Sequence, residues 1–263
     1  MKIINGLAVF EDGHKSNKPV IFIHGFPFDH TMWQNQVEFL KNNRYCVTYD
    51  VRGLGQSDAG DGQYTIESFT DDLLQIVDEL KLNKPVLCGL SMGGYIALRA
   101  VQREQKRFGG LVLMSTKASQ DDNDGKLKRA EGIKKINTQG VEKYVAGMMP
   151  NCFCDLTMQE MKEVYDETLN KAVKYNPTGV KGCLLAMAGR LDLESFLMEI
   201  EVPALVICGS LDKIVLPGAM REISEKIKDS EFAATPRAGH ITPLENPEFI
   251  NDILSGFLNR RVK

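Results

Sequence analysis

Residues 85–94 read Pro85-Val86-Leu87-Cys88-Gly89-Leu90-Ser91-Met92-Gly93-Gly94, a short apolar run that ends in a Gly-x-Ser-x-Gly pattern. Good helix formers follow at 95–100. The pattern is typical of a nucleophile elbow, in which a serine occupies a sharp strand-to-helix turn with its hydroxyl exposed. Glycine is required two residues before and two residues after the serine, because backbone and helix approach too closely there for side chains. Ser91 is therefore the candidate nucleophile.

Short, mostly apolar runs alternate with longer amphipathic segments on both sides of this elbow. The strands are predicted at 18–23, 44–49, 85–89, 109–114, 203–208 and 230–235, and the helices at 31–41, 66–81, 93–105, 217–228 and 247–259. This alternation predicts an α/β fold with a mostly parallel sheet whose strands are covered by helices on both faces. The first dozen residues predict an antiparallel edge hairpin with its turn at Glu11-Asp12-Gly13.

Residues 118–195 break the alternation. They contain helix-period segments at 126–137, 140–148, 157–175 and 179–189, preceded by a polar, turn-rich linker at 120–125. We therefore expect a sheet core of residues 1–117 and 196–263, with 118–195 inserted between two of its strands as a helical segment. The methionines of this segment can line an adaptable pocket, but packing of the insertion onto the core is the simpler explanation for most of them.

A serine hydroxyl is a weak nucleophile and needs an adjacent base. Of the four histidines, His240 lies in a loop after the last predicted strand and before the final helix, which is where the chain order Ser, acid, His requires the base. His14 belongs to the early hairpin and is expected at the surface. His24 is expected to brace a loop, and His30 to be structural or to face the substrate.

The third member of such a triad is a carboxylate that orients the histidine and stabilises its protonated form. Asp212 follows the predicted strand 203–208 in a tight loop upstream of His240. Its rivals are Asp121, Asp122 and Asp124, which follow the preceding strand but lie in the linker that is expected to be solvated. The sequence therefore favours Asp212.

The oxyanion formed on attack requires two backbone donors. The N–H of Met92, directly after the nucleophile, is one candidate. The segment His24-Gly25-Phe26-Pro27 leaves the strand 18–23 where such folds place the second donor. Pro27 has no N–H, so the N–H of Phe26 is the expected second donor.

Composition excludes several other classes of protein. Lys and Arg number 32 against 35 Asp and Glu, a net charge of −3, so no basic excess favours nucleic acid. No apolar run approaches the ~20 residues of a membrane span, and no signal-peptide core follows Met1. We therefore expect a cytoplasmic protein without membrane or nucleic-acid partners. The six cysteines are expected as free thiols, since Cys152-Phe153-Cys154 lacks zinc-site spacing; neither a metal nor a cofactor is expected.

The ordered motifs resemble the α/β-hydrolase superfamily over almost the whole chain. They are His24-Gly25-Phe26-Pro27, the loop Asp50-Val51-Arg52-Gly53-Leu54-Gly55-Gln56-Ser57-Asp58, the Ser91 elbow, Asp212 and Gly239-His240. The resemblance implies an α/β-hydrolase core of residues 1–117 and 196–263, with the insertion 118–195 in the place of the family's helical cap. Within that superfamily the elbow and the Phe-Pro-Phe-Asp loop are similar to those of bacterial carboxylesterases and 3-oxoadipate enol-lactonases. The resemblance implies that Asp50 and Arg52 brace the scaffold. Ser91 argues against epoxide hydrolases and haloalkane dehalogenases, which use an aspartate at the elbow.

The expected function is a serine hydrolase that cleaves a small carboxylic ester or lactone through an acyl-enzyme, acting as a monomer or homodimer. Three alternatives stay open. The same triad can serve thioester or C–C bond hydrolysis or a lyase step of the menaquinone-pathway type. Pro27 leaves a perhydrolase side activity as a further hypothesis. A hydrolase-like ligand-binding protein is the third alternative, which the complete set of nucleophile, base and acid disfavours.

Overall fold

A single eight-stranded sheet organises the chain in the computed structural model, which describes residues 1–262. The strand order is β1-β2-β4-β3-β5-β6-β7-β8, and all strands from β4 to β8 run parallel. The strands are β1 Lys2–Ile4, β2 Leu7–Asp12, β3 Pro19–Ile23, β4 Tyr45–Tyr49, β5 Val86–Leu90, β6 Gly110–Met114, β7 Ala204–Gly209 and β8 Ser230–Thr235. The predicted α/β fold with a mostly parallel sheet is confirmed.

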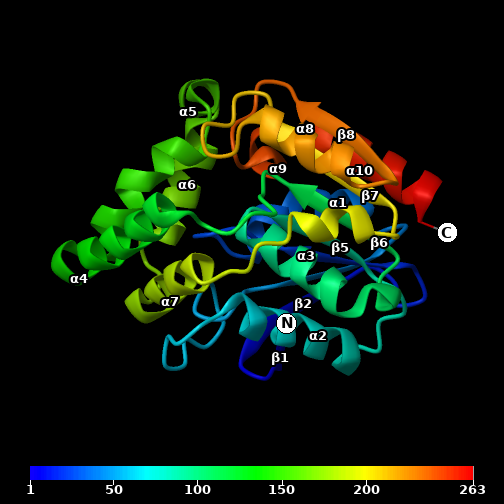
Figure 1. Cartoon of the computed structure of the whole chain (residues 1–263), viewed down its shortest axis with the longest axis horizontal. Helices are drawn as coiled ribbons and strands as arrows, with labels where there is room; N and C mark the ends of the chain where they lie inside the picture. The colour runs from blue at the N-terminus through cyan, green and yellow to red at the C-terminus, as the bar shows by residue number, and fades with distance from the viewer. Residues whose placement is uncertain (263) are drawn as a thin grey trace.

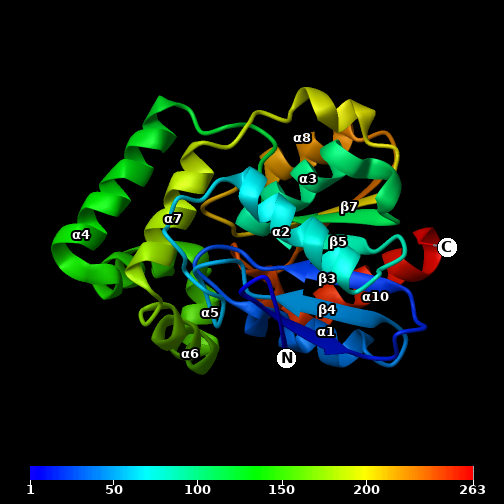
Figure 2. The ribbon, with the colours of Figure 1, turned by 90° about the horizontal axis from the view of Figure 1, so that it is seen from below.

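Helices cover both faces of this sheet (Figures 1 and 2). α2, α3 and α8 lie on one side and α1 and α10 on the other. The bounds are α1 Gln34–Leu40, α2 Ile66–Glu79, α3 Met92–Glu104, α8 Pro217–Lys226 and α10 Pro247–Arg261. Short elements complete the core, namely η1 His30–Trp33, η2 Gln105–Arg107, η3 Ser195–Glu199 and α9 Thr242–Glu245. In α10 the buried residues Ile250, Leu254 and Phe257 recur every three or four positions, which gives the helix one apolar face toward the sheet.

The amino-terminal hairpin is confirmed, but the turn was predicted at the wrong place. The chain reverses at Asn5-Gly6, where both residues have positive φ (48° and 77°), as a two-residue type I′ turn requires. Glu11 and Asp12 instead belong to β2 and pair with β4 in antiparallel register. The predicted strand 230–235 also differs from expectation, because β8 is an edge strand and most of its residues are only partly buried.

Four helices lie between β6 and β7 in the chain and gather at one end of the sheet, drawn in green to yellow-green in Figure 1. They are α4 Asn123–Cys152, α5 Asp155–Glu160, α6 Lys162–Ala172 and α7 Pro177–Ala188. α4 is interrupted at Gly140 (φ 86°). The predicted linker 120–125 is shorter than expected, because Asp122 caps α4 by accepting the N–H of Gly125 at 2.7 Å.

The apolar core runs continuously from the sheet into this insertion, where Val145, Met149 and Leu184 are buried. All six cysteines are buried free thiols. Among residues 1–262, no helix combines the length and the apolar character that crossing a membrane requires.

Candidate active site

Ser91 occupies a strained elbow between β5 and α3. Its backbone has φ 54° and ψ −113°, a conformation that side-chain-bearing residues rarely adopt. A Cβ on Gly89 would lie 2.2 Å from the carbonyl oxygen of Gly93, and one on Gly93 would lie 2.1 Å from that of Ile23. The glycine requirement predicted at both positions is thus confirmed. The backbone of Ser91 is held from β6, since its N–H donates to the Met114 carbonyl at 2.9 Å.

Asp212 and His240 meet in the interior, above the carboxyl ends of β7 and β8. His240 Nδ1 lies 2.9 Å from Asp212 Oδ2, and both residues are at most 3% exposed. A carboxylate only accepts hydrogen bonds, so Nδ1 carries the proton and Nε2 is left free to accept one. The other oxygen, Oδ1, accepts the N–H groups of Ile214 and Val215 at 2.8 and 2.9 Å.

The acid is held in its ionised form. Burial by itself would raise the pKa of Asp212, but His240 and the N–H groups of Val215 and Ile214 outweigh burial and lower it. Ionised Asp212 can therefore orient the imidazole at neutral pH.

The rival acids do not reach His240. Asp121 was expected in a solvated linker, which is wrong, because its carboxylate is buried between Arg190 Nη1 at 2.7 Å and Arg129 Nε at 3.1 Å. Asp122 caps α4, and Asp124 is exposed in the first turn of that helix.

The loop that leaves β3 lies directly against the elbow. A Cβ on Gly25 would come within 3.3 Å of the Ser91 Cβ. Phe26 and Met92 are both buried, and within residues 1–262 their backbone N–H groups form no hydrogen bond. Buried N–H groups without an acceptor are rare in folded proteins. These two are free to donate to an oxyanion.

His24 and His30 brace this region. His24 is fully buried; its Nε2 accepts the Val51 N–H at 2.8 Å and its Nδ1 donates to the Gly25 carbonyl at 2.8 Å. Burial lowers the pKa of His24, which keeps the ring neutral for this pair of bonds. His30 Nδ1 bonds Asp50 Oδ1 at 2.8 Å, a contact that fits the structural alternative predicted for it. The bracing roles of His24 and Asp50 are likewise confirmed.

One group of metal-ligating types occurs among the described residues, formed by Asp29, His30 and Asp50. Its oxygens are already occupied. Both Asp50 oxygens accept hydrogen bonds, from His30 and from the Gln56 N–H at 2.8 Å, and Asp29 accepts from Thr31 and Tyr175. These bonds explain the cluster as part of the scaffold.

Comparison with known proteins places this arrangement in a family. Residues 18–247 match the family described as the alpha/beta hydrolase fold. The chain belongs to the α/β-hydrolase fold family. A relative from Acinetobacter baylyi, 3-oxoadipate enol-lactonase 1, is 30% identical over 252 residues, which cover 96% of this chain and 92% of that protein.

Two solved α/β-hydrolase structures superpose closely on the chain. A thermophilic esterase from Thermogutta terrifontis, solved with malate bound, has a TM-score of 0.94 and 32% identity, covering 98% of this chain and 94% of that one. The enol-lactonase from Burkholderia xenovorans LB400 has a TM-score of 0.90 and 29% identity, covering 98% of both chains. The similarity therefore includes the inserted helices as well as the α/β-hydrolase sheet.

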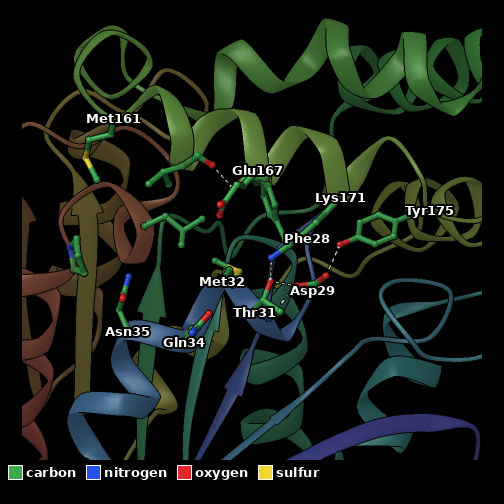
Figure 3. A pocket seen from close by; sticks show the side chains of 14 residues that line it. Phe28, Asp29, Thr31, Met32, Gln34, Asn35, Met161, Glu167, Lys171 and Tyr175 are labelled. Carbon is green, nitrogen blue, oxygen red and sulfur yellow. Dashed lines mark hydrogen bonds between the residues drawn. The ribbon is translucent and has the colours of Figure 1, made fainter.

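A cleft of about 270 Å³ separates the insertion from the core of this α/β hydrolase (Figure 3). Its walls are α6, with Glu167 and Lys171, and the segment 28–35 that follows the Phe26 loop. Tyr175 donates to Asp29 Oδ2 at 2.9 Å across it, and Lys171 Nζ donates to Thr31 Oγ1 at 3.1 Å. Neither Ser91 nor His240 lines this cleft.

Sequence reasoning missed one acidic residue that contacts the His240 loop. Glu245 is 5% exposed, and one of its oxygens accepts the N–H groups on either side of His240. The only signal available was its place five residues after His240 in the same loop and short helix.

Proposed function

We propose that this α/β hydrolase is a serine hydrolase that cleaves small carboxylic esters or lactones, with Ser91, His240 and Asp212 as its catalytic triad. The buried His240–Asp212 pair carries the proposal, because it leaves Nε2 of His240 as a base at the carboxyl edge of the sheet where the Ser91 elbow also lies. The fold alone would not support this function, since unrelated chemistries share it.

In the first half of the reaction, Ser91 Oγ attacks the substrate carbonyl carbon while its proton passes to His240 Nε2. Asp212 keeps the ring in the required tautomer and stabilises the imidazolium. The negative charge that develops on the carbonyl oxygen is stabilised by the N–H groups of Phe26 and Met92. Collapse of this intermediate breaks the C–O bond, and His240 returns the proton to the leaving alkoxide.

In the second half, water attacks the acyl-enzyme. His240 Nε2 takes one proton from the water, a second oxyanion forms in the same place, and its collapse releases the acid and restores Ser91 with the proton from His240. For a lactone, the alcohol and acid of the product remain joined in one molecule. No group beyond these residues and water is needed.

The names of the relatives support the substrate class. They include a 3-oxoadipate enol-lactonase at 30% identity and a solved esterase at 32% identity, so a lactonase and an esterase are represented at similar sequence identity. We propose that residues 118–195 act as the cap that selects among such substrates, because α6 faces the segment 28–35, which directly follows the Phe26 loop, across the cleft.

The test is the turnover of short-chain p-nitrophenyl esters and of small lactones by Ser91→Ala. We expect kcat to fall by on the order of 10⁴-fold or more, because no other hydroxyl occupies the elbow. Ser195→Ala, an exposed serine in η3, is the matched control and should retain the activity of the unchanged protein. Full activity in Ser91→Ala would contradict the proposal. If the unchanged protein hydrolysed thioesters but no esters or lactones, the proposed substrate class would be wrong.

A further inference from the structure

Glu245, the last residue of α9, carries a buried carboxylate for which the proposed mechanism has no use. No Lys, Arg or His among residues 1–262 lies within ion-pair distance of it. A buried charge without an ion pair needs several hydrogen bonds to offset its desolvation. The side chain must therefore be held by other donors.

Four donors surround this carboxylate. Oε1 accepts the N–H groups of Gly239 at 2.9 Å and Ile241 at 3.0 Å. Oε2 accepts the N–H of Cys154 and the hydroxyl of Thr157, both at 2.8 Å. An ionised carboxylate has about four acceptor sites, so this set of donors uses them all.

The two oxygens hold different parts of the molecule. Oε1 binds the backbone on both sides of His240, whereas Oε2 binds Cys154, between α4 and α5 of the insertion, and Thr157 in α5. Two further observations bring the same parts together. The N–H of His240 donates to the Cys152 carbonyl at 3.0 Å, and a Cβ on Gly239 would lie 2.6 Å from the Cys154 nitrogen.

We infer that Glu245 is a positioning residue for His240, fastening the loop of the general base to residues 152–157 of the insertion. Asp212 orients the imidazole at its Nδ1, and Glu245 fixes the backbone from which the ring projects. Displacement of a reacting group by about 1 Å costs on the order of 100-fold in rate. The inference rests on the proposed function, because it assigns Glu245 to the base of that mechanism.

Glu245→Gln is the sharpest substitution, because it keeps size and shape. An amide has one acceptor oxygen and an NH₂ group that cannot accept, so in either orientation two of the four donors lose their acceptor. We expect kcat for a short-chain ester to fall about 10- to 100-fold with KM within about twofold, measured where circular dichroism shows the variant folded.

Glu248→Gln is the matched control. It makes the same change at an exposed glutamate three residues further along, in the first turn of α10. We expect its kcat to stay within about threefold of that of the unchanged protein. A second readout is the rate of inactivation by a fluorophosphonate, which also needs His240 as base and should fall in parallel with kcat in Glu245→Gln.

A folded Glu245→Gln protein with a lower melting temperature and unchanged kcat would overturn the inference, because Glu245 would then only stabilise the fold. If this variant does not fold, Gly239→Ala separates the same two segments while keeping the carboxylate; a selective loss of kcat supports the inference and full activity overturns it. Failure of the proposed function is a separate result, namely full activity in Ser91→Ala.

Discussion

Ser91 combines a strained backbone with buried surroundings. A residue held at φ 54° and ψ −113° costs of order 1–3 kcal/mol, which neighbouring contacts must offset. Two hydrogen bonds from β6 and the residues after it do so, namely Ser91 N–H to the Met114 carbonyl and Thr116 Oγ1 to the Ser91 carbonyl at 2.7 Å. The backbone of Ser91 is thereby held at the carboxyl end of β5, next to Gly25.

The role of Asp212 is tested by Asp212→Asn. The amide would donate to His240 Nδ1 and favour the tautomer with its proton on Nε2, which cannot accept from Ser91. We expect kcat for ester hydrolysis to fall by about 10⁴-fold with little change in KM, measured by steady-state kinetics at neutral pH.

The control for that variant is Asp166→Asn on the surface of α6, where the ion pair with Lys162 is exposed and contributes little. If the kcat of Asp212→Asn stays within tenfold of that of the unchanged protein, a group other than Asp212 orients His240.

The main residues of the candidate site could be predicted from sequence because each lies in a short local pattern. Ser91 stands between two spaced glycines, and Asp212 and His240 each follow a predicted strand in the order that the fold demands. The burial of Asp121 and the contacts of Glu245 could not be predicted. Their partners, Arg190 and Cys154, lie 69 and 91 residues away, so only the folded chain brings them together.

At the scale of elements, the two ends of the insertion are tied to each other and to α3. Arg190, after α7, pairs with Asp121, before α4, and its guanidinium lies 4.4 Å from the ring centroid of Tyr95 in α3. The N–H of Leu193 also donates to the Ala118 carbonyl at 2.8 Å. The insertion therefore leaves and rejoins the core at one point, beside the helix that begins at the elbow.

Asp121→Asn should lower the free energy of unfolding at pH 7 by about 3–5 kcal/mol, because it leaves the buried Arg190 charge without its partner. Burial would raise the pKa of Asp121, but Arg129 and Arg190 outweigh burial and lower it. The ionised carboxylate of Asp121 therefore stabilises the folded protein above about pH 3.9, the pKa of an Asp in the unfolded chain. This stabilisation is lost as the pH falls below that value. Urea denaturation should therefore show a smaller difference in free energy of unfolding between Asp121→Asn and the unchanged protein at pH 3.5 than at pH 7.

The neighbouring Asp124→Asn, exposed in α4, is the control and should change stability by less than about 0.5 kcal/mol. This account of the ion pair would be contradicted in either of two cases. In the first, Asp121→Asn and the unchanged protein have the same free energy of unfolding at pH 7. In the second, the difference between their free energies of unfolding is larger at pH 3.5 than at pH 7.

The bounds of the elements could be predicted well where apolar periodicity is strong. Each predicted strand in the parallel part of the sheet agrees with the structure within one residue at either end. The position of the hairpin turn could not be predicted, because Glu11-Asp12-Gly13 and Asn5-Gly6 both have residues typical of turns. Only the pairing of Glu11 and Asp12 with β4 distinguishes the two. Likewise α4 extends through Pro150, where the sequence predicted an earlier end.

At the scale of the whole molecule, one apolar core joins the sheet to the insertion. The cluster includes Phe22 and Trp33 in the core and Met149 and Leu184 in the insertion. Shared burial of this kind favours cooperative unfolding, because neither part keeps its apolar surface covered without the other.

Thermal unfolding should therefore be a single transition. Trp33 is the only tryptophan and is fully buried beside Phe22, with ring centroids 5.2 Å apart, so its fluorescence reports on the core. Far-ultraviolet circular dichroism also reports on the helices of the insertion. The two melting curves should coincide, whereas loss of helix signal before the fluorescence change would show that the insertion unfolds independently.

The central claim is that Ser91 is a nucleophile activated by His240, and covalent labelling tests it most directly. The intact folded protein is treated with a fluorophosphonate and analysed by mass spectrometry of the whole chain and of its peptides. We predict one adduct per chain, located on Ser91, formed far more slowly in His240→Ala and absent in Ser91→Ala. A folded protein that stays unlabelled, or that carries its adduct on another residue, would contradict the account.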